Sequence, residues 1–334
     1  MPLINSVEIR YLIFCDKRFL RSAVKELAEE FPSLKIESTD PSGRFIVGSS
    51  KAAARPGELT FVESVIPVSI ELDGMKYVNK EVLIALQEVI KSKDRFKIEA
   101  LNLSSHSGAN AKTIEVFLGQ ALEKQGLVAD LDNPTVLVYV VLAGGKIFIC
   151  KTDEKYVLDA FRANKFGKDE KISRAEFKLK EAVDYFGIDA SGLKLALDIG
   201  AAPGGWSNYM AKQGAKVIAV DNAALAYEKL DMRRIVHIPK RAHDVDMESL
   251  KGLDIGILLM DMNIAPADSA NLAIRFADIL KKGAYLILTI KLVDFRIEKH
   301  IKDVEEILSK EYRGIRLKKL PHNRQELTLF AIKK

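Results

Sequence analysis

Cysteine is nearly absent from the sequence, which has 334 residues and only two cysteines, Cys15 and Cys150. Each lies in an apolar run, and neither belongs to a Cys-x-x-Cys pair or to a cluster of cysteine and histidine. This spacing disfavours both a disulfide framework and a zinc site, so we expect no bound metal.

Long apolar runs are absent as well. No run approaches the roughly 18 to 20 residues that a membrane-spanning helix needs. The first residues, Met-Pro-Leu-Ile-Asn-Ser-Val-Glu, lack the basic segment and apolar core of a signal peptide. We therefore expect a cytoplasmic protein with no membrane contact. The net charge of +5 permits a polyanionic partner without requiring one.

The N-terminal half alternates short apolar runs with helical patterns, which predicts a small α+β unit over residues 1–70 and a second over 71–152. The predicted strands are 9–15, 44–48, 59–65, 96–103, 135–142 and 146–151, and the predicted helices are 20–30, 80–91 and 111–125. A hairpin turn is expected at Gly144-Gly145. Residues 153–171 are charged, with few apolar side chains, and predict a linker.

From residue 172 to residue 334 the pattern becomes one of strands alternating with helices. The predicted strands are 194–199, 216–220, 255–260 and 285–290, and the predicted helices are 206–213 and 267–281. Strands of almost continuous apolar residues between helices are typical of a mainly parallel sheet covered on both faces. The predicted fold class is therefore α/β, with a Rossmann-like, doubly wound sheet after the α+β part.

The strongest local signal is a glycine-rich turn, Asp198-Ile-Gly-Ala-Ala-Pro-Gly-Gly-Trp-Ser207, between a predicted strand and a predicted helix. Glycines there let a ligand lie against the main chain, although a tight turn without a ligand would also explain them. Asp221 follows the next strand, where a carboxylate can accept hydrogen bonds from both ribose hydroxyls. A dinucleotide fold would have Gly-x-Gly-x-x-Gly, so this spacing favours an adenosine-containing cofactor without a pyrophosphate.

Two charged residues end buried strands. Asp261 follows the strand 255–260 and Lys291 follows 285–290, which places both at the edge where open α/β sheets bind ligands. A lysine buried beside Ile290 and Leu292 must be paired or lose its proton, because desolvation lowers its pKa. The pattern predicts a lysine that can act as a base.

The run 198–207 resembles the first motif of the FtsJ-like ribose methyltransferases, which have a class I methyltransferase fold and use S-adenosylmethionine. The resemblance implies that the Gly200 to Gly205 loop holds the methionine part of the cofactor and Asp221 its ribose. Asp244 would lie near the adenine, with a helix-capping or solvated aspartate as an equal alternative. The predicted cofactor-binding residues are Asp198, Gly200, Ala201, Pro203, Gly204, Gly205, Trp206, Asp221, Asp244 and Asp261.

The resemblance also implies a catalytic set of Lys178, Asp261, Lys291 and Glu326. Lys178 is expected on a helix capped by Ser173, and Glu326 at the start of the last strand. Lys291, kept partly neutral by burial and by nearby Lys178, would be the general base for a ribose 2′-hydroxyl. Asp261 and Glu326 would orient the two ammonium groups and offset their charge. For Lys178 or Glu326 taken alone, a surface ion pair is the alternative.

Two other methyl acceptors are disfavoured. Methylation of an adenine amino group calls for an aromatic residue that stacks a flipped base, and Asp261-Met-Asn-Ile-Ala-Pro266 has none. Methylation of cytosine at C5 needs a nucleophilic cysteine, and both cysteines lie in the N-terminal half.

Residues 96–151 resemble a THUMP domain, which implies RNA binding, and the 1–70 unit is expected to be ferredoxin-like. Within the FtsJ-like family the chain is most similar to the bacterial enzymes that methylate a cytidine of large-subunit ribosomal RNA. The alternatives are a tRNA 2′-O-methyltransferase and a non-catalytic RNA-binding assembly factor on the same fold. Phe295 and Tyr312 are candidates for stacking a base. The basic residues expected to contact RNA are Arg233, Arg234, Lys240, Arg241, Arg313, Arg316, Lys318, Lys319 and Arg324.

Overall fold

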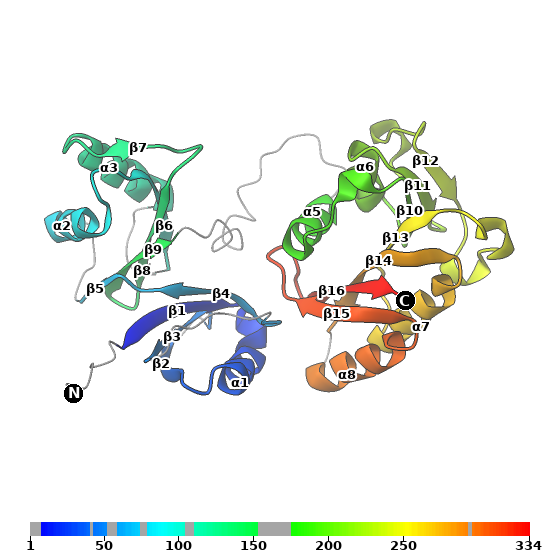
Figure 1. Ribbon diagram of the computed structural model, residues 1–334, viewed down its shortest axis with the longest axis horizontal. Coiled ribbons are helices and arrows are strands. Elements are labelled where there is room, and N and C mark those ends of the chain that lie inside the picture. Colours follow the sequence, from blue (N-terminus) through cyan, green and yellow to red (C-terminus); the bar gives the residue numbers. More distant parts are fainter. Residues whose placement is uncertain are drawn as a thin grey trace. The chain divides into compact units, whose positions relative to one another are not determined.

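The computed structural model describes residues 8–40, 43–51, 59–73, 79–103, 110–152, 175–292 and 296–334. The chain divides into two compact units, Met1–Leu158 and Asp159–Lys334 (Figure 1). The predicted linker at 153–171 and the predicted cap Ser173 lie outside the described residues. The division into three domains stays a prediction.

The first unit contains a four-stranded antiparallel sheet in the order β2-β3-β1-β4. Its elements are β1 (Ile9–Cys15), α1 (Leu20–Glu30), β2 (Lys35–Thr39), β3 (Phe45–Ser50) and β4 (Val62–Pro67). The predicted strand 9–15 and helix 20–30 are confirmed, because each carries the apolar pattern that its element buries. In α1 the buried residues Ala23 and Leu27 lie four positions apart, on one helix face. The ferredoxin-like assignment stays a prediction.

The second sheet of this unit has five strands in the order β5-β9-β8-β6-β7. Its elements are β5 (Ile70–Leu72), α2 (Lys80–Val89), β6 (Arg95–Asn102), α3 (Ala111–Glu123), β7 (Val128–Ala129), β8 (Val136–Ala143) and β9 (Lys146–Thr152). Asn79 and Asn110 cap the two helices by accepting hydrogen bonds from backbone N–H groups. The hairpin at Gly144-Gly145 is confirmed, with φ values of 57° and 78°. The THUMP assignment stays a prediction.

The second unit is built on a seven-stranded sheet in the order β12-β11-β10-β13-β14-β16-β15. Its helices and strands are α5 (Ala175–Phe186), β10 (Leu195–Ile199), α6 (Gly205–Lys212), β11 (Lys216–Val220), β12 (Ile235–Ile238), β13 (Ile255–Met260), α7 (Pro266–Ala277), β14 (Leu280–Lys291), α8 (Ile297–Leu308), β15 (Tyr312–Lys318) and β16 (Glu326–Lys333). The strands from β10 to β14 are parallel, whereas β16 is antiparallel to β14 and β15. The predicted α/β class with a mostly parallel sheet is confirmed.

Helices cover both faces of this sheet (Figure 1). α5 and α6 share one apolar cluster with β10, β13 and β16, to which Leu179, Met210 and Leu259 contribute. α7 and α8 pack against each other on the opposite face. Because β10, β11, β13 and β14 are parallel, their carboxyl ends meet at one edge of the sheet. The antiparallel direction of β16 brings its first residue to the same edge.

The two cysteines, one in β1 and one in β9, are buried in the core. Burial, together with nearby acidic residues, raises the pKa of the Cys15 thiol to about 12. Of the helices that the structure describes, none is long and apolar enough to span a membrane.

Candidate active site

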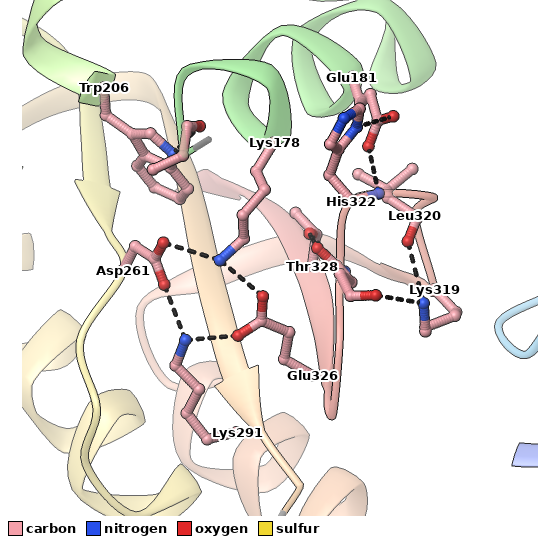
Figure 2. Close-up of polar contacts among 12 residues, drawn as sticks. Lys178, Glu181, Trp206, Asp261, Lys291, Lys319, Leu320, His322, Glu326 and Thr328 are labelled. Atoms are coloured by element: carbon pink, nitrogen blue, oxygen red, sulfur yellow. Dashed lines mark hydrogen bonds and ion pairs between the residues drawn. The ribbon is translucent and has the colours of Figure 1, made fainter. Parts of the chain in front are cut away.

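Four charged side chains meet at the carboxyl edge of the seven-stranded sheet and form a closed ring (Figure 2). Lys178 Nζ, from α5, lies 2.8 Å from Asp261 Oδ2 and 2.6 Å from Glu326 Oε1. Lys291 Nζ, at the end of β14, lies 3.0 Å from Asp261 Oδ1 and also contacts Glu326 Oε2. Each carboxylate therefore bridges both ammonium groups, and the structure brings together all four residues of the predicted catalytic set.

The ring is largely shielded from solvent. The exposed fractions of the side chains are 11% for Lys178, 17% for Asp261, 18% for Lys291 and 9% for Glu326. The register of the sheet explains part of this arrangement, because Lys291 on β14 is paired with Glu326 on β16. Charges as buried as these must be compensated, and two cations against two anions leave no net charge.

The ring sets the protonation of its members. Burial raises the pKa of the Asp261 carboxyl, but the charges of Lys178 and Lys291 outweigh it, and the net pKa lies below the ordinary value. Burial lowers the pKa of Lys291, but Asp261 and Glu326 together raise it above its ordinary value. The prediction that burial and Lys178 leave Lys291 partly neutral is therefore wrong for this arrangement, because two carboxylates hold its proton.

Two hydrogen bonds from α6 hold the first turn of α5, the helix that carries Lys178. Trp206 Nε1 donates a hydrogen bond of 2.7 Å to the Ala175 carbonyl, and Asn208 Nδ2 donates one of 3.1 Å to Glu176 Oε2. Both donors belong to α6, the helix that follows the glycine-rich loop. Trp206 is only 3% exposed, and this bond ties its side chain to α5. Its predicted contact with a cofactor stays a prediction.

The glycine-rich loop lies between β10 and α6, at the same edge as the ring. Gly200 and Gly204 have φ values of 78° and 113°, in the left-handed region that favours glycine. A Cβ atom on Gly200 would lie 2.5 Å from Met262 Cγ, and one on Gly204 would lie 2.8 Å from Leu230 Cδ1. The backbone angles thus favour glycine at these two positions, and a Cβ atom at either would also displace a neighbouring side chain.

Asp221 joins this loop to the end of β11. Its Oδ2 accepts a hydrogen bond of 3.0 Å from the Ala202 N–H, and its Oδ1 accepts one of 2.8 Å from the Ala223 N–H. Each carboxylate oxygen has a second lone pair, so Asp221 can still accept bonds from a ligand. The Asp221 side chain thus links the glycine-rich loop to the turn after β11. These are the two segments predicted to hold the methionine and ribose parts of the cofactor.

Residues 172–326 match the family model described as FtsJ-like methyltransferase. This part of the chain is therefore similar to the FtsJ-like methyltransferases and is called the FtsJ-like domain below. An uncharacterized protein of Methanocaldococcus jannaschii is 33% identical over 48% of this chain and 47% of its own length, so the chain spans about half of that relative. Ribosomal RNA large subunit methyltransferase M of Histophilus somni (strain 129Pt) is 25% identical over 95% of this chain and 98% of that protein. The crystal structure of TrmN from Thermus thermophilus aligns over 98% of this chain and 99% of its own, with 15% identity and a TM-score of 0.39.

Asp198 lies in the interior of the FtsJ-like domain, beneath the loop. Its side chain is 1% exposed, and its Oδ2 accepts a hydrogen bond of 2.6 Å from Ser207 Oγ. Burial raises the pKa of this carboxyl to about 7, although the bond from Ser207 opposes the shift. Through Ser207 in the first turn of α6, Asp198 supports the loop from below. Its direct contact with a cofactor stays a prediction.

The raised pKa of Asp198 gives a testable pH dependence. Because the folded protein holds this proton more tightly than the unfolded chain, the stability contribution is full below about pH 4 and is lost as the pH rises to about 7. Asp198→Asn keeps an acceptor for Ser207 and never ionises. We expect the unfolding free energy of the wild type to fall relative to that of the variant by about 1.4 kcal/mol per pH unit across this window. Urea unfolding at several pH values measures this difference, and parallel curves would contradict the assignment.

The other predicted cofactor residues of the FtsJ-like domain also border the carboxyl edge. Ala201 is buried, Pro203 is exposed and Gly205 begins α6. Asp244 ends a short 3-10 helix, Ala242–Asp244, that follows β12, and its side chain is exposed. Its place beside the adenine stays a prediction.

Two of the lysines predicted to contact RNA, Lys318 and Lys319, are buried, which corrects that expectation for these two residues. Lys319 is 1% exposed and donates hydrogen bonds to the carbonyls of Leu320 and Asn323, while Lys318 is 7% exposed. Tyr312 is 1% exposed and donates to the Ala273 carbonyl, so it cannot stack a base. The other stacking candidate, Phe295, lies outside the described residues.

The remaining basic residues divide by environment. Arg316 packs over the rings of Phe186 and Phe330, at 5.1 and 5.7 Å from their centroids. The solvent-exposed ones are Arg233, Arg234, Lys240, Arg241, Arg313 and Arg324. Arg233 and Arg234 precede β12, and Lys240 and Arg241 follow it. An RNA-binding role remains a prediction for these exposed residues.

Proposed function

We propose that the protein transfers a methyl group from S-adenosylmethionine to a ribose 2′-hydroxyl of a structured RNA, with large-subunit ribosomal RNA as the favoured substrate. The observation that carries this proposal is the buried ring of Lys178, Asp261, Lys291 and Glu326 beside the glycine-rich loop. The ribosomal RNA methyltransferase that aligns with 95% of the chain supports the choice of substrate.

The residues at this edge suit S-adenosylmethionine. At Gly200, Gly204 and Gly205 the loop offers backbone without side chains, and Asp221 has acceptor capacity for two ribose hydroxyls. In this proposal Asp244, which follows β12, contacts the adenine. When bound, this cofactor supplies an activated sulfonium methyl group.

The chain's own task is to present the hydroxyl and to remove its proton. A ribose hydroxyl is a poor nucleophile at neutral pH, so its proton must leave as the new oxygen–carbon bond forms. In our proposal Lys291 Nζ takes that proton, and Lys178 fixes the two carboxylates that hold Lys291. The ring keeps Lys291 largely protonated, so the reactive form is a minor fraction that grows as the pH rises.

The same ring argues against a non-catalytic assembly factor. Four charges cost desolvation energy when they are buried, and a scaffold gains nothing from them that apolar side chains would not give. Ribose methylation of tRNA, the alternative, would use identical chemistry on a different RNA.

The test uses methyl-labelled S-adenosylmethionine and total RNA from cells that lack the gene. We expect label in large-subunit ribosomal RNA, in dinucleotides that resist alkaline cleavage because a methylated 2′-oxygen cannot attack the neighbouring phosphate. Label in tRNA would keep the chemistry and change the substrate. Label that leaves alkaline cleavage intact would contradict ribose methylation, and the absence of label from RNA and from isolated ribosomal subunits would favour the scaffold.

A further inference from the structure

A second polar contact joins α5, which carries Lys178, to the turn that leads into Glu326 and β16. Glu181 lies on α5, one turn after Lys178, and both of its carboxylate oxygens are engaged by His322 (Figure 2). The His322 backbone N–H donates a hydrogen bond of 2.9 Å to Oε2, and the ring Nδ1 contacts Oε1. The Glu181 side chain thus fixes both the backbone and the imidazole ring of His322.

The contact is shielded and held from a further side. The exposed fractions are 7% for the His322 side chain and 16% for that of Glu181. The imidazole stacks on Phe177 of α5, with ring centroids 5.1 Å apart and planes 15° from parallel. A hydrogen bond away from water is worth more than one at the surface, so this contact can resist sliding of α5 along β16.

His322 belongs to a rigid turn that ends at Glu326. Lys319 Nζ closes the turn by donating to the Asn323 carbonyl at 2.6 Å, and Asn323 Nδ2 donates to Thr328 Oγ1 at 2.9 Å. A displacement of His322 is therefore transmitted to the start of β16. The distance between Lys178 and Glu326, 2.6 Å in the ring, depends on how α5 lies against this turn.

We propose that Glu181 and His322 are a positioning pair that holds Lys178 of α5 in register with Glu326 of β16. The inference rests on the proposed function, since it assigns the pair a role in turnover. Without the pair, α5 can shift against β16, Glu326 loses Lys178 and turns to Lys291 alone, and the ring no longer presents Lys291 to the hydroxyl. A displacement of about 1 Å at a reacting group can cost about 100-fold in rate.

The experiment compares two substitutions of Glu181 with a matched control. Glu181→Leu removes the contact, and we expect kcat to fall about 10- to 100-fold with KM for cofactor and RNA within about twofold. Glu181→Gln keeps the geometry, because its amide oxygen accepts from the His322 N–H and its NH2 group donates to the other imidazole tautomer. That variant should retain kcat within about threefold. Asp184→Leu, which removes the exposed Lys180 ion pair on the same helix, should match the wild type.

His322→Leu removes the same contact from the side of the turn, and we expect the same loss of kcat. This variant tests the inference even if Glu181→Leu does not fold. Full turnover in a folded Glu181→Leu or His322→Leu variant would overturn the inference. So would a Glu181→Gln variant as slow as Glu181→Leu, because charge and not geometry would then be decisive. A wild type that methylates no RNA would overturn the proposed function instead, and the inference with it.

Discussion

Replacement of Lys291 by methionine should abolish methyl transfer while leaving cofactor binding intact. Methionine keeps most of the length of the side chain but cannot take a proton, and loss of a general base typically lowers turnover by about 10²- to 10⁴-fold. The measurement is kcat with saturating RNA, together with the Kd of S-adenosylmethionine by calorimetry. Lys281→Met, on the same strand but in an exposed ion pair with Asp254, is the control and should keep wild-type activity.

The pH dependence of the wild type tests the role of Lys291 independently. Because Asp261 and Glu326 raise the pKa of Lys291 against the effect of burial, the neutral form is rare at pH 7 and becomes about tenfold more abundant with each pH unit. We expect log kcat to rise with a slope near one between pH 7 and pH 9. A flat profile in that range would show that the proton goes elsewhere and would make Lys291 an orienting cation.

Replacement of Asp261 by alanine should lower the free energy of unfolding more than any other substitution proposed here. It leaves Lys178 and Lys291 with Glu326 as their common partner in the ring, so an excess positive charge is buried. Breaking a buried ion pair from one side costs about 3 kcal/mol or more. Urea unfolding at pH 7 measures this loss, and Asp254→Ala in the exposed pair with Lys281 should change stability by less than about 0.5 kcal/mol.

The unfolding free energy lost in Asp261→Ala should become smaller as the pH falls. The pKa of Asp261 is lowered in the folded protein, so its contribution is complete above about pH 4, the ordinary range of an aspartate, and disappears as acid protonates the carboxyl. The stability curves of wild type and Asp261→Ala should therefore converge on the acid side. A gap of constant size would show that lost packing and not lost charge accounts for the effect.

The sequence predicted the fold best where one pattern decided each element. The strands 216–220 and 255–260 were predicted at their observed bounds, because continuous apolar runs of that length suit buried parallel strands. The helix Ile297–Leu308 was assigned no element, although Ile297, Ile301, Val304 and Leu308 recur at helical spacing. The strand Lys35–Thr39 has mostly exposed side chains and no alternation, so hydrophobic pattern could not reveal it.

The residues of the ring could be predicted from the sequence, but the protonation state of Lys291 could not. Family resemblance named Lys178 and Glu326, which come from distant parts of the sequence and which spacing alone would not join. Whether Lys291 is neutral depends on its contacts with the carboxylates of Asp261, at 3.0 Å, and of Glu326, and a linear sequence does not contain such contacts. For the same reason Lys319 was expected at the surface, since only the fold shows two backbone carbonyls arranged around its ammonium group.

The position of β16 has a consequence for synthesis. This strand lies between β14 and β15, although it follows both in the chain, and among the described strands β15 pairs with β16 alone. During translation β15 therefore leaves the ribosome without a neighbour and must wait for β16 before it can join the sheet. Glu326 is the first residue of that late strand, so the ring closes in the same event that completes the sheet. A nascent chain that has not yet added β16 therefore cannot form the ring of four charges.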